Sequence, residues 1–135
     1  MKYLLDANIL ISLASEDHVF RSRAEQWVRS LKKSGDEIAS CAVTELALVR
    51  ILSQLPGLRI EVADAKRLLE EMKTRCPVAF HLISDAMGAD KLPAWVKTAK
   101  QTTDGHLAEL AKANGAVLAT LDGKIPGAFV IPESV

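Results

Sequence analysis

KYLLD at residues 2–6 and AVLATLD at residues 116–122 are short apolar stretches that each end in an aspartate. Apolar runs of four to eight residues bounded by polar residues are typical of strands buried in a parallel sheet. Residues 38–41 (IASC), 78–83 (VAFHLI) and 129–131 (FVI) are three further candidate strands. The pattern therefore predicts about five short strands distributed along the chain.

Helical patterns separate these strands. Apolar residues recur at helical spacing over 18–33, 44–52 and 61–75, and a further helix is expected from Thr102-Thr103-Asp104 to the stop signal Asn114-Gly115. Asn8 is expected to cap a short helix over 9–13, while residues 84–101 show no clear pattern. Strands that alternate with helices predict an α/β fold with a parallel sheet, helices on both faces, and one domain over residues 1–135.

Composition excludes several classes of protein. The chain has 135 residues, 49% of them hydrophobic, and a formal net charge of zero. These values disfavour disorder and a strongly basic nucleic-acid coat. Cys41 and Cys76 form no disulfide framework and have no zinc-ligand spacing. No apolar run approaches the 18 or more residues that a membrane span needs, so a cytoplasmic protein without a targeting segment is expected.

Four acidic residues fall at equivalent positions in this pattern. Asp6 and Asp122 end predicted strands, Glu45 lies just after another, and Asp104 begins a helix. Ligands of open α/β sheets bind at the carboxyl ends of the strands. Two carboxylates about 4 Å apart repel by roughly 4 kcal/mol at an effective dielectric near 20, so protons or a cation must neutralise such a group. Oxygen ligands favour Mg²⁺ or Mn²⁺, whose usual chemistry in proteins is phosphate chemistry.

Each acid also has a structural interpretation. Asp6 and Asp122 are suited to turns, Glu45 to a helix N-terminus, and Asp104 to a helix cap. Taken singly, these structural roles are favoured, and only the shared placement of the four acids points to catalysis. His106 is interpreted as a surface or partly buried histidine, although it lies two residues after Asp104.

Four blocks of this sequence together resemble the PIN-domain nucleases, and among them the VapC toxins of bacterial toxin–antitoxin pairs. The blocks are LDAN at 5–8, TEL at 44–46 followed by Arg50, TD at 103–104, and LATLD at 118–122. The resemblance runs from Tyr3 to about Ile131. It implies a three-layer α/β/α sandwich around a parallel sheet of about five strands, a Mg²⁺- or Mn²⁺-dependent endoribonuclease, and a cognate VapB-type antitoxin.

The resemblance also assigns site residues. Asp6, Glu45 and Asp104 match the acidic triad of the family, and Asp122 matches its more variable fourth acid. Together they would hold the metal and act in catalysis. Asn8 matches a polar residue near the metal. Thr103 matches a hydroxyl position beside the acids, and a helix cap is an equal alternative for it. Gly123-Lys124 departs from the continuation found in many relatives, which leaves the role of Lys124 open.

RNA near an acidic site needs cations for its phosphates, and Arg50, Lys97, Lys100 and Lys124 are the candidates. A plain surface charge is an even alternative for each. With 4% aromatic residues, a short loop or structured RNA (tRNA, rRNA or mRNA) is favoured over long single strands. The apolar faces of 20–31 and 44–55 are expected to form a homodimer interface or an antitoxin groove, with burial in the core as the alternative.

Two other functions remain open at this point. A catalytically inactive PIN-like RNA-binding or protein-interaction module would fit the same fold, although all four acids are present. A small phosphatase of the kind that needs a second aspartate two residues after the first is disfavoured, because that position is Asn8.

Overall fold

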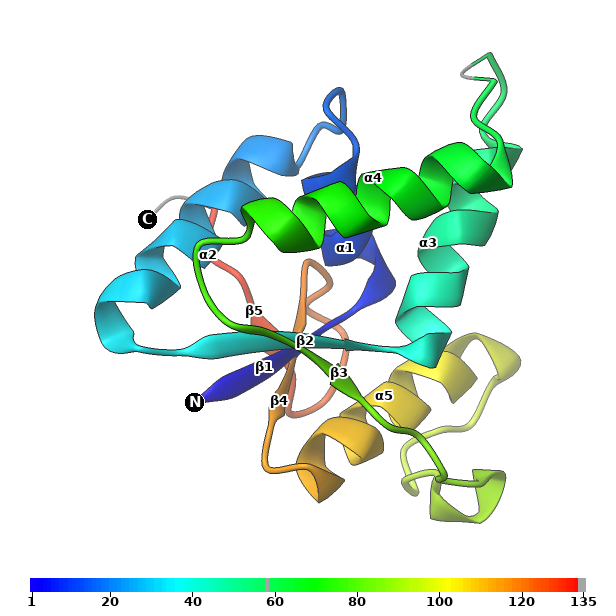
Figure 1. Cartoon of the computed structure of the whole chain (residues 1–135). Coiled ribbons are helices and arrows are strands. Elements are labelled where there is room, and N and C mark those ends of the chain that lie inside the picture. The colour runs from blue at the N-terminus through cyan, green and yellow to red at the C-terminus, as the bar shows by residue number, and fades with distance from the viewer. Residues whose placement is uncertain (58, 134–135) are drawn as a thin grey trace.

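The computed structural model describes residues 1–57 and 59–133; Leu58, Ser134 and Val135 lie outside the described residues. Its centre is a five-stranded sheet in the order β3-β2-β1-β4-β5, in which every neighbouring pair is parallel (Figure 1). The strands are β1 (Lys2–Leu5), β2 (Glu37–Cys41), β3 (Phe80–Ile83), β4 (Val117–Thr120) and β5 (Phe129–Val130). The predicted α/β class with a parallel sheet of about five strands is confirmed.

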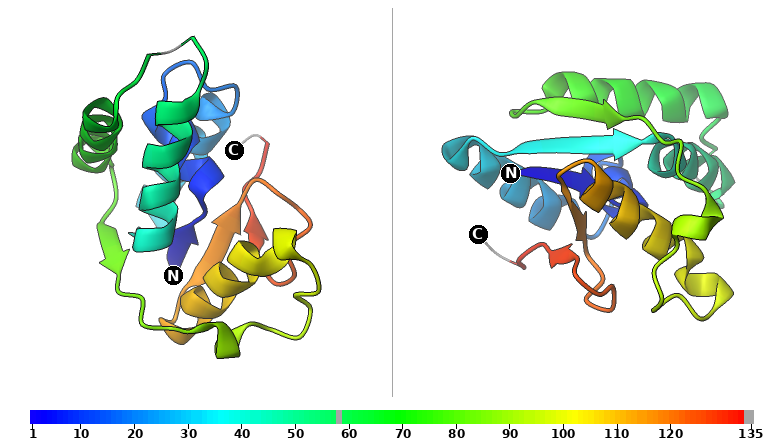
Figure 2. Two further views of the ribbon diagram at one scale, coloured as in Figure 1. Left: turned by 90° about the vertical axis from the view of Figure 1, so that its right-hand side faces the viewer. Right: turned by 90° about the horizontal axis from the view of Figure 1, so that it is seen from below.

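Helices cover both faces of the sheet unequally. The helices are α1 (Ala7–Ala14), α2 (Arg21–Ser34), α3 (Ala42–Gln54), α4 (Val62–Arg75) and α5 (Thr102–Ala113). Figures 1 and 2 show α1 to α4 on one face and α5 on the other. The result is a three-layer α/β/α arrangement in which α5 is the longest element of its layer within the described ranges.

The hydrophobic core is divided by the sheet because side chains alternate along each strand. Leu5 and Ile38 belong to the cluster shared with α1 to α4, whereas Leu4 and Ala39 belong to the cluster shared with α5. The three central strands β1, β2 and β4 are therefore largely buried from both sides, whereas Leu82 of the edge strand β3 is exposed.

Several predicted boundaries differ from the structure by one to three residues, and two of them concern elements that begin later than expected. The helix expected from residue 18 begins at Arg21, because the preceding residues form turns in which the His18 N–H donates to Ser15 O and the Arg21 N–H donates to His18 O. The strand expected from residue 78 begins at Phe80. The stretch 84–101, which shows no clear pattern, contains two short 3₁₀ turns, Ala89–Lys91 and Ala99–Gln101.

The apolar face of α2 is part of the core. Ala24, Trp27, Val28 and Leu31 are buried, and only Phe20, the residue just before the helix, is exposed. This outcome favours the core interpretation of that face over an interface. Within the described ranges, the helices are all too short or too polar to cross a membrane.

The parallel register brings the acidic residues toward one edge of the sheet. Leu5 of β1 is paired with Ala119 of β4, so the next residues, Asp6 and Thr120, are neighbours. Glu45 lies in the first turn of α3, which follows β2, and Asp104 lies in the first turn of α5. The carboxyl ends of the strands thus carry the residues from which the site is built.

Candidate active site

Asp6 lies between the last residue of β1, Leu5, and the first residue of α1, Ala7. Its backbone is extended, and its Oδ1 accepts hydrogen bonds from the backbone N–H groups of Asn8 (3.0 Å) and Ile9 (3.3 Å). Asp6 is therefore the N-cap of α1, and the prediction that Asn8 is the cap is wrong. The cap must be the last residue with extended backbone before the helix, and that residue is Asp6. Asn8 lies one residue inside α1 and is exposed.

The second carboxylate oxygen of Asp6 is held by Thr120. The Thr120 hydroxyl donates to Asp6 Oδ2 at 2.5 Å and accepts from the Asp122 N–H at 3.0 Å. Asp6 is 6% exposed and Thr120 is fully buried. Thr120 was not among the residues predicted for the site. The signal that could have found it is a hydroxyl residue inside an apolar strand, two residues before an acid at the end of that strand.

Asp104 interacts electrostatically with both Asp6 and Asp122, and we call these three aspartates the aspartate cluster. Burial raises the pKa of Asp6; the hydrogen bonds from Thr120, Ile9 and Asn8 oppose this, and the charge of Asp104 adds to it. Burial also raises the pKa of Asp104, with a further contribution from the charge of Asp122. The three carboxylates are thus electrostatically coupled, and a nearby cation would relieve their repulsion.

Glu45 is held differently from the aspartate cluster. Its Oε2 accepts a hydrogen bond from the Ser40 hydroxyl and lies 2.7 Å from Lys73 Nζ. Ser40 is the fourth residue of β2 and is fully buried, while Lys73 lies in the last turn of α4. This carboxylate is therefore already partnered by a cation within the chain.

The chemistry of these donors fits a hard divalent cation, because such cations prefer carboxylate oxygens and several carboxylates lie at one edge of the sheet. The carboxyl groups of Asp6 and Asp104 also have raised pKa values. Within residues 1–57 and 59–133, however, no three His, Cys, Asp or Glu side chains are arranged so that they could hold one metal ion. That the four acids share a cation stays a prediction.

The remaining predicted site residues all have exposed side chains. Thr103 is inside α5, so its alternative role as a helix cap is wrong, because Gln101 occupies the N-cap position. Asp104 likewise lies inside the first turn of α5 rather than at its cap. The predicted RNA contacts have exposed side chains and no carboxylate partner among the described ion pairs: Arg50, Lys97, Lys100 and Lys124.

His106 forms a pair that the sequence did not predict. Its Nε2 lies 2.5 Å from Asp85 Oδ2, and the two side chains are 17% and 13% exposed. Burial would raise the pKa of Asp85, but the hydrogen bonds from His106 and from the Met87 N–H outweigh it and lower the pKa. The histidine is partly buried, as expected, and it links α5 to the segment that follows β3.

A comparison with known proteins agrees with this architecture. The PIN domain family model matches residues 3–128. Ribonuclease VapC38 of Mycobacterium tuberculosis is 32% identical over 133 residues, covering 96% of this chain and 89% of that relative. Ribonuclease VapC44 of the same species is 36% identical over 134 residues, covering 93% and 89%. The chain therefore belongs to the PIN-domain family and, within it, to the VapC-type group.

A solved structure supports the same fold. The crystal structure of VapBC2 from Rickettsia felis, bound to a DNA fragment from their promoter, superimposes with a TM-score of 0.64. The sequence identity is 18%, and the match covers 96% of each chain. The fold predicted from the four sequence blocks is confirmed.

Replacing Asp104 by Asn should stabilise the metal-free protein at neutral pH. A carboxyl group with a raised pKa in the folded state costs stability above its ordinary pKa, and the cost grows as pH rises through the raised value. In EDTA, we expect a higher urea midpoint for Asp104→Asn than for wild type at pH 7. The difference should shrink as pH falls toward about 4, the ordinary aspartate value. The exposed Asp17→Asn is the control, and an unchanged or lower midpoint at pH 7 would contradict the coupling.

Replacing Thr120 by Val should destabilise the protein by about 1.5–3 kcal/mol at pH 7, because a buried hydrogen bond to a charged group is lost without a change of shape. Thr120→Ser keeps the hydroxyl and should lose less. Urea unfolding of both variants measures the difference. Equal stability of the Val and Ser variants would show that the hydroxyl does not support Asp6.

Replacing Gly105 by Ala should also destabilise the fold. A Cβ at this position would lie 2.3 Å from Val96 Cγ2 and 3.2 Å from Pro93 Cδ, so the segment before α5 packs directly on its first turn. Overpacking costs about 1–3 kcal/mol, which exceeds the roughly 1 kcal/mol that alanine gains over glycine in a helix. Gly123→Ala is the control, since in the described part of the chain no atom outside Gly123 and its two neighbours lies within 4 Å of the added Cβ. A stabilised Gly105→Ala variant would argue against this packing.

Proposed function

We propose that this chain is a metal-dependent endoribonuclease and the toxin component of a VapBC-type toxin–antitoxin pair, acting in the cytoplasm on tRNA, rRNA or mRNA. The main support is the aspartate cluster, in which Asp6 and Asp104 have raised pKa values at the carboxyl edge of the sheet. Its curated relatives are named ribonucleases, which agrees with this chemistry. The same support favours an enzyme over an inactive module.

The residues proposed to hold Mg²⁺ or Mn²⁺ are Asp6, Glu45 and Asp104, with Asp122 as a fourth acid that binds the cation or supports the others. When bound, such a cation stabilises the negative charge that develops during phosphodiester hydrolysis and lowers the pKa of its bound water. The chain itself orients these acids. Thr120 and the N-terminus of α1 fix both oxygens of Asp6, and Ser40 fixes Glu45.

The exposed cations around the site are proposed to bind the RNA backbone. Lys97 and Lys100 precede α5, Lys124 follows Asp122, and Arg50 lies on α3. Asn8 and Thr103, both exposed near the aspartate cluster, are proposed to support the metal or the substrate. Phosphate contacts of this kind position RNA without reading its sequence.

A pocket between α1, α2 and α4 supports the proposal of an antitoxin partner. It has a volume of about 210 Å³, and its apolar walls include Leu13, Val28 and Met72. Its charged lining residues are Arg21, Glu25, Arg29 and Arg75.

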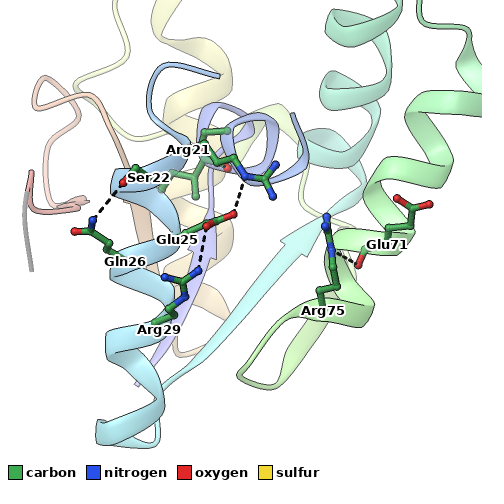
Figure 3. Close-up of polar contacts among 9 residues, drawn as sticks. Arg21, Ser22, Glu25, Gln26, Arg29, Glu71 and Arg75 are labelled. Carbon is green, nitrogen blue, oxygen red and sulfur yellow. Dashed lines mark hydrogen bonds and ion pairs between the residues drawn. The ribbon is translucent and has the colours of Figure 1, made fainter. Parts of the chain in front are cut away.

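Figure 3 shows how these charges are arranged. Glu25 pairs with Arg21 Nε at 2.7 Å and with Arg29 Nη2 at 3.2 Å. Across the gap, Arg75 Nε donates to the Glu71 carbonyl oxygen, and the Glu71 carboxylate points away. The described lining of this pocket therefore carries three guanidinium groups and one carboxylate. A partner segment with an acidic side chain and apolar neighbours, of the kind expected for an antitoxin tail, would complement this pocket.

A homodimer is also part of the proposal. Leu46 on α3 is 66% exposed and Val62 at the start of α4 is 54% exposed, so both helices keep a large apolar side chain on the surface. Burying such side chains against a second copy would be favourable.

Removing one acid should abolish cleavage without unfolding the protein. Asp6→Asn, Asp104→Asn and Glu45→Gln should each lower the rate of RNA cleavage in Mn²⁺ by at least about 100-fold, the loss typical of removing one charge-stabilising group from an active site. Cleavage of defined RNAs followed on gels measures the rate, and circular dichroism confirms folding. Asp17→Asn should cleave as wild type does. Full activity in any of the three variants, or in EDTA, would refute the proposal.

A further inference from the structure

Lys73 is built into the fold beside one of the four acids. Its Nζ lies 2.7 Å from Glu45 Oε2, and the two side chains are 24% and 19% exposed. The ammonium also lies 5.6 Å from the centre of the Phe80 ring, and Glu70 Oε1 is 3.8 Å away. Groups from α3, α4 and β3 thus contact this one cation. Its environment differs from that of the exposed, independent ion pairs typical of a protein surface.

The same oxygen of Glu45 has a second partner. The hydroxyl of Ser40, a fully buried residue of β2, also donates to Oε2. Two donors from different elements therefore fix the orientation of this carboxylate. A hydrogen-bonded charge pair at this level of burial is more rigid than one in water, because the local dielectric is lower.

The contrast with the aspartate cluster gives the pair its significance. Asp6, Asp104 and Asp122 have no Lys or Arg partner among the described ion pairs, whereas Glu45 does. A divalent cation and an ammonium group on the same carboxylate repel each other. Binding of a divalent cation by Glu45 would therefore weaken the ion pair between Glu45 and Lys73.

We propose that Lys73 is a positioning residue that holds Glu45 Oε2 and competes with the divalent cation for this carboxylate, so that the Lys73–Glu45 pair sets the metal affinity of the site. This inference rests on the proposed metal-dependent function. Lys73 touches neither substrate nor metal in this scheme, and it acts only through Glu45.

The test is a double-mutant cycle read out as Mn²⁺ affinity, measured by calorimetry and by the electron paramagnetic resonance signal of free Mn²⁺. Lys73→Met keeps the length of the side chain and removes its charge. We expect it to lower the Mn²⁺ dissociation constant about 3- to 10-fold. A tenfold difference corresponds to the interaction energy that shifts a pKa by one unit. In the Glu45→Gln background, the same change should alter the constant less than about twofold, because the route through Glu45 is gone.

Two control variants separate positioning from general charge effects. Lys73→Arg keeps the positive charge on Glu45 and should bind Mn²⁺ much as wild type does. Lys66→Met removes an exposed charge from the same helix and should leave the affinity unchanged. Circular dichroism and urea unfolding establish that each variant is folded. In RNA cleavage, the Mn²⁺ concentration for half-maximal rate should fall in Lys73→Met in parallel with the dissociation constant.

The outcomes are distinct. Unchanged or weaker Mn²⁺ binding in Lys73→Met would overturn the inference, and so would equal tightening in the wild-type and Glu45→Gln backgrounds, which would indicate a long-range charge effect. After either of these results, the proposed function still stands if the wild-type protein binds Mn²⁺ and cleaves RNA. If wild type neither binds Mn²⁺ nor cleaves RNA, the proposed function and this inference both fail.

Discussion

The carboxylate of Asp6 is the point on which the arrangement of the site depends. It is almost inaccessible to water, and burial alone would disfavour its charge. Two backbone N–H groups of α1 and the Thr120 hydroxyl of β4 offset part of that cost. The same hydrogen bonds attach the first helix to the first strand and the first strand to its neighbour. One side chain therefore joins the sheet to the helical layer and also supplies the most buried charge of the site.

The parallel arrangement of the strands allows Asp6 to have both a structural role and a place in the site. Because β1 lies between β2 and β4, the residues that follow these three strands all emerge at one edge. Residues separated by more than a hundred positions, such as Asp6 and Thr120, become direct partners. The acids do not share one environment, however. The three aspartates repel one another, whereas Glu45 is neutralised by Lys73. The ion pairs of the described residues thus include one with Glu45 and none with the three aspartates.

Much of the fold and of the acidic site could be predicted from the sequence, since apolar runs and helical periodicity are local signals. The details that depend on two distant segments could not. Asn8 is a good capping residue by type, but the strand ends one residue before Asp6, and that geometry decides which residue caps. Lys73 and Asp85 look like ordinary surface charges in the sequence. Their partners, Glu45 and His106, lie on other elements, and nothing in the local pattern pairs them.

One face of the sheet is covered by four helices and the other mainly by α5, and this difference affects how the molecule responds to local unfolding. α5 carries Asp104 in its first turn and provides Leu107, Leu110 and Ala111 to the cluster that covers its face of the sheet. Detachment of this one helix would expose the underlying strands and disperse the acidic group at the same moment. Amide hydrogens of α5 should therefore exchange with solvent through the same fluctuation that disperses these acids, because a detached helix of this length is only marginally stable in water. Resistance to inactivation and resistance to local unfolding are, in this architecture, a single property of α5.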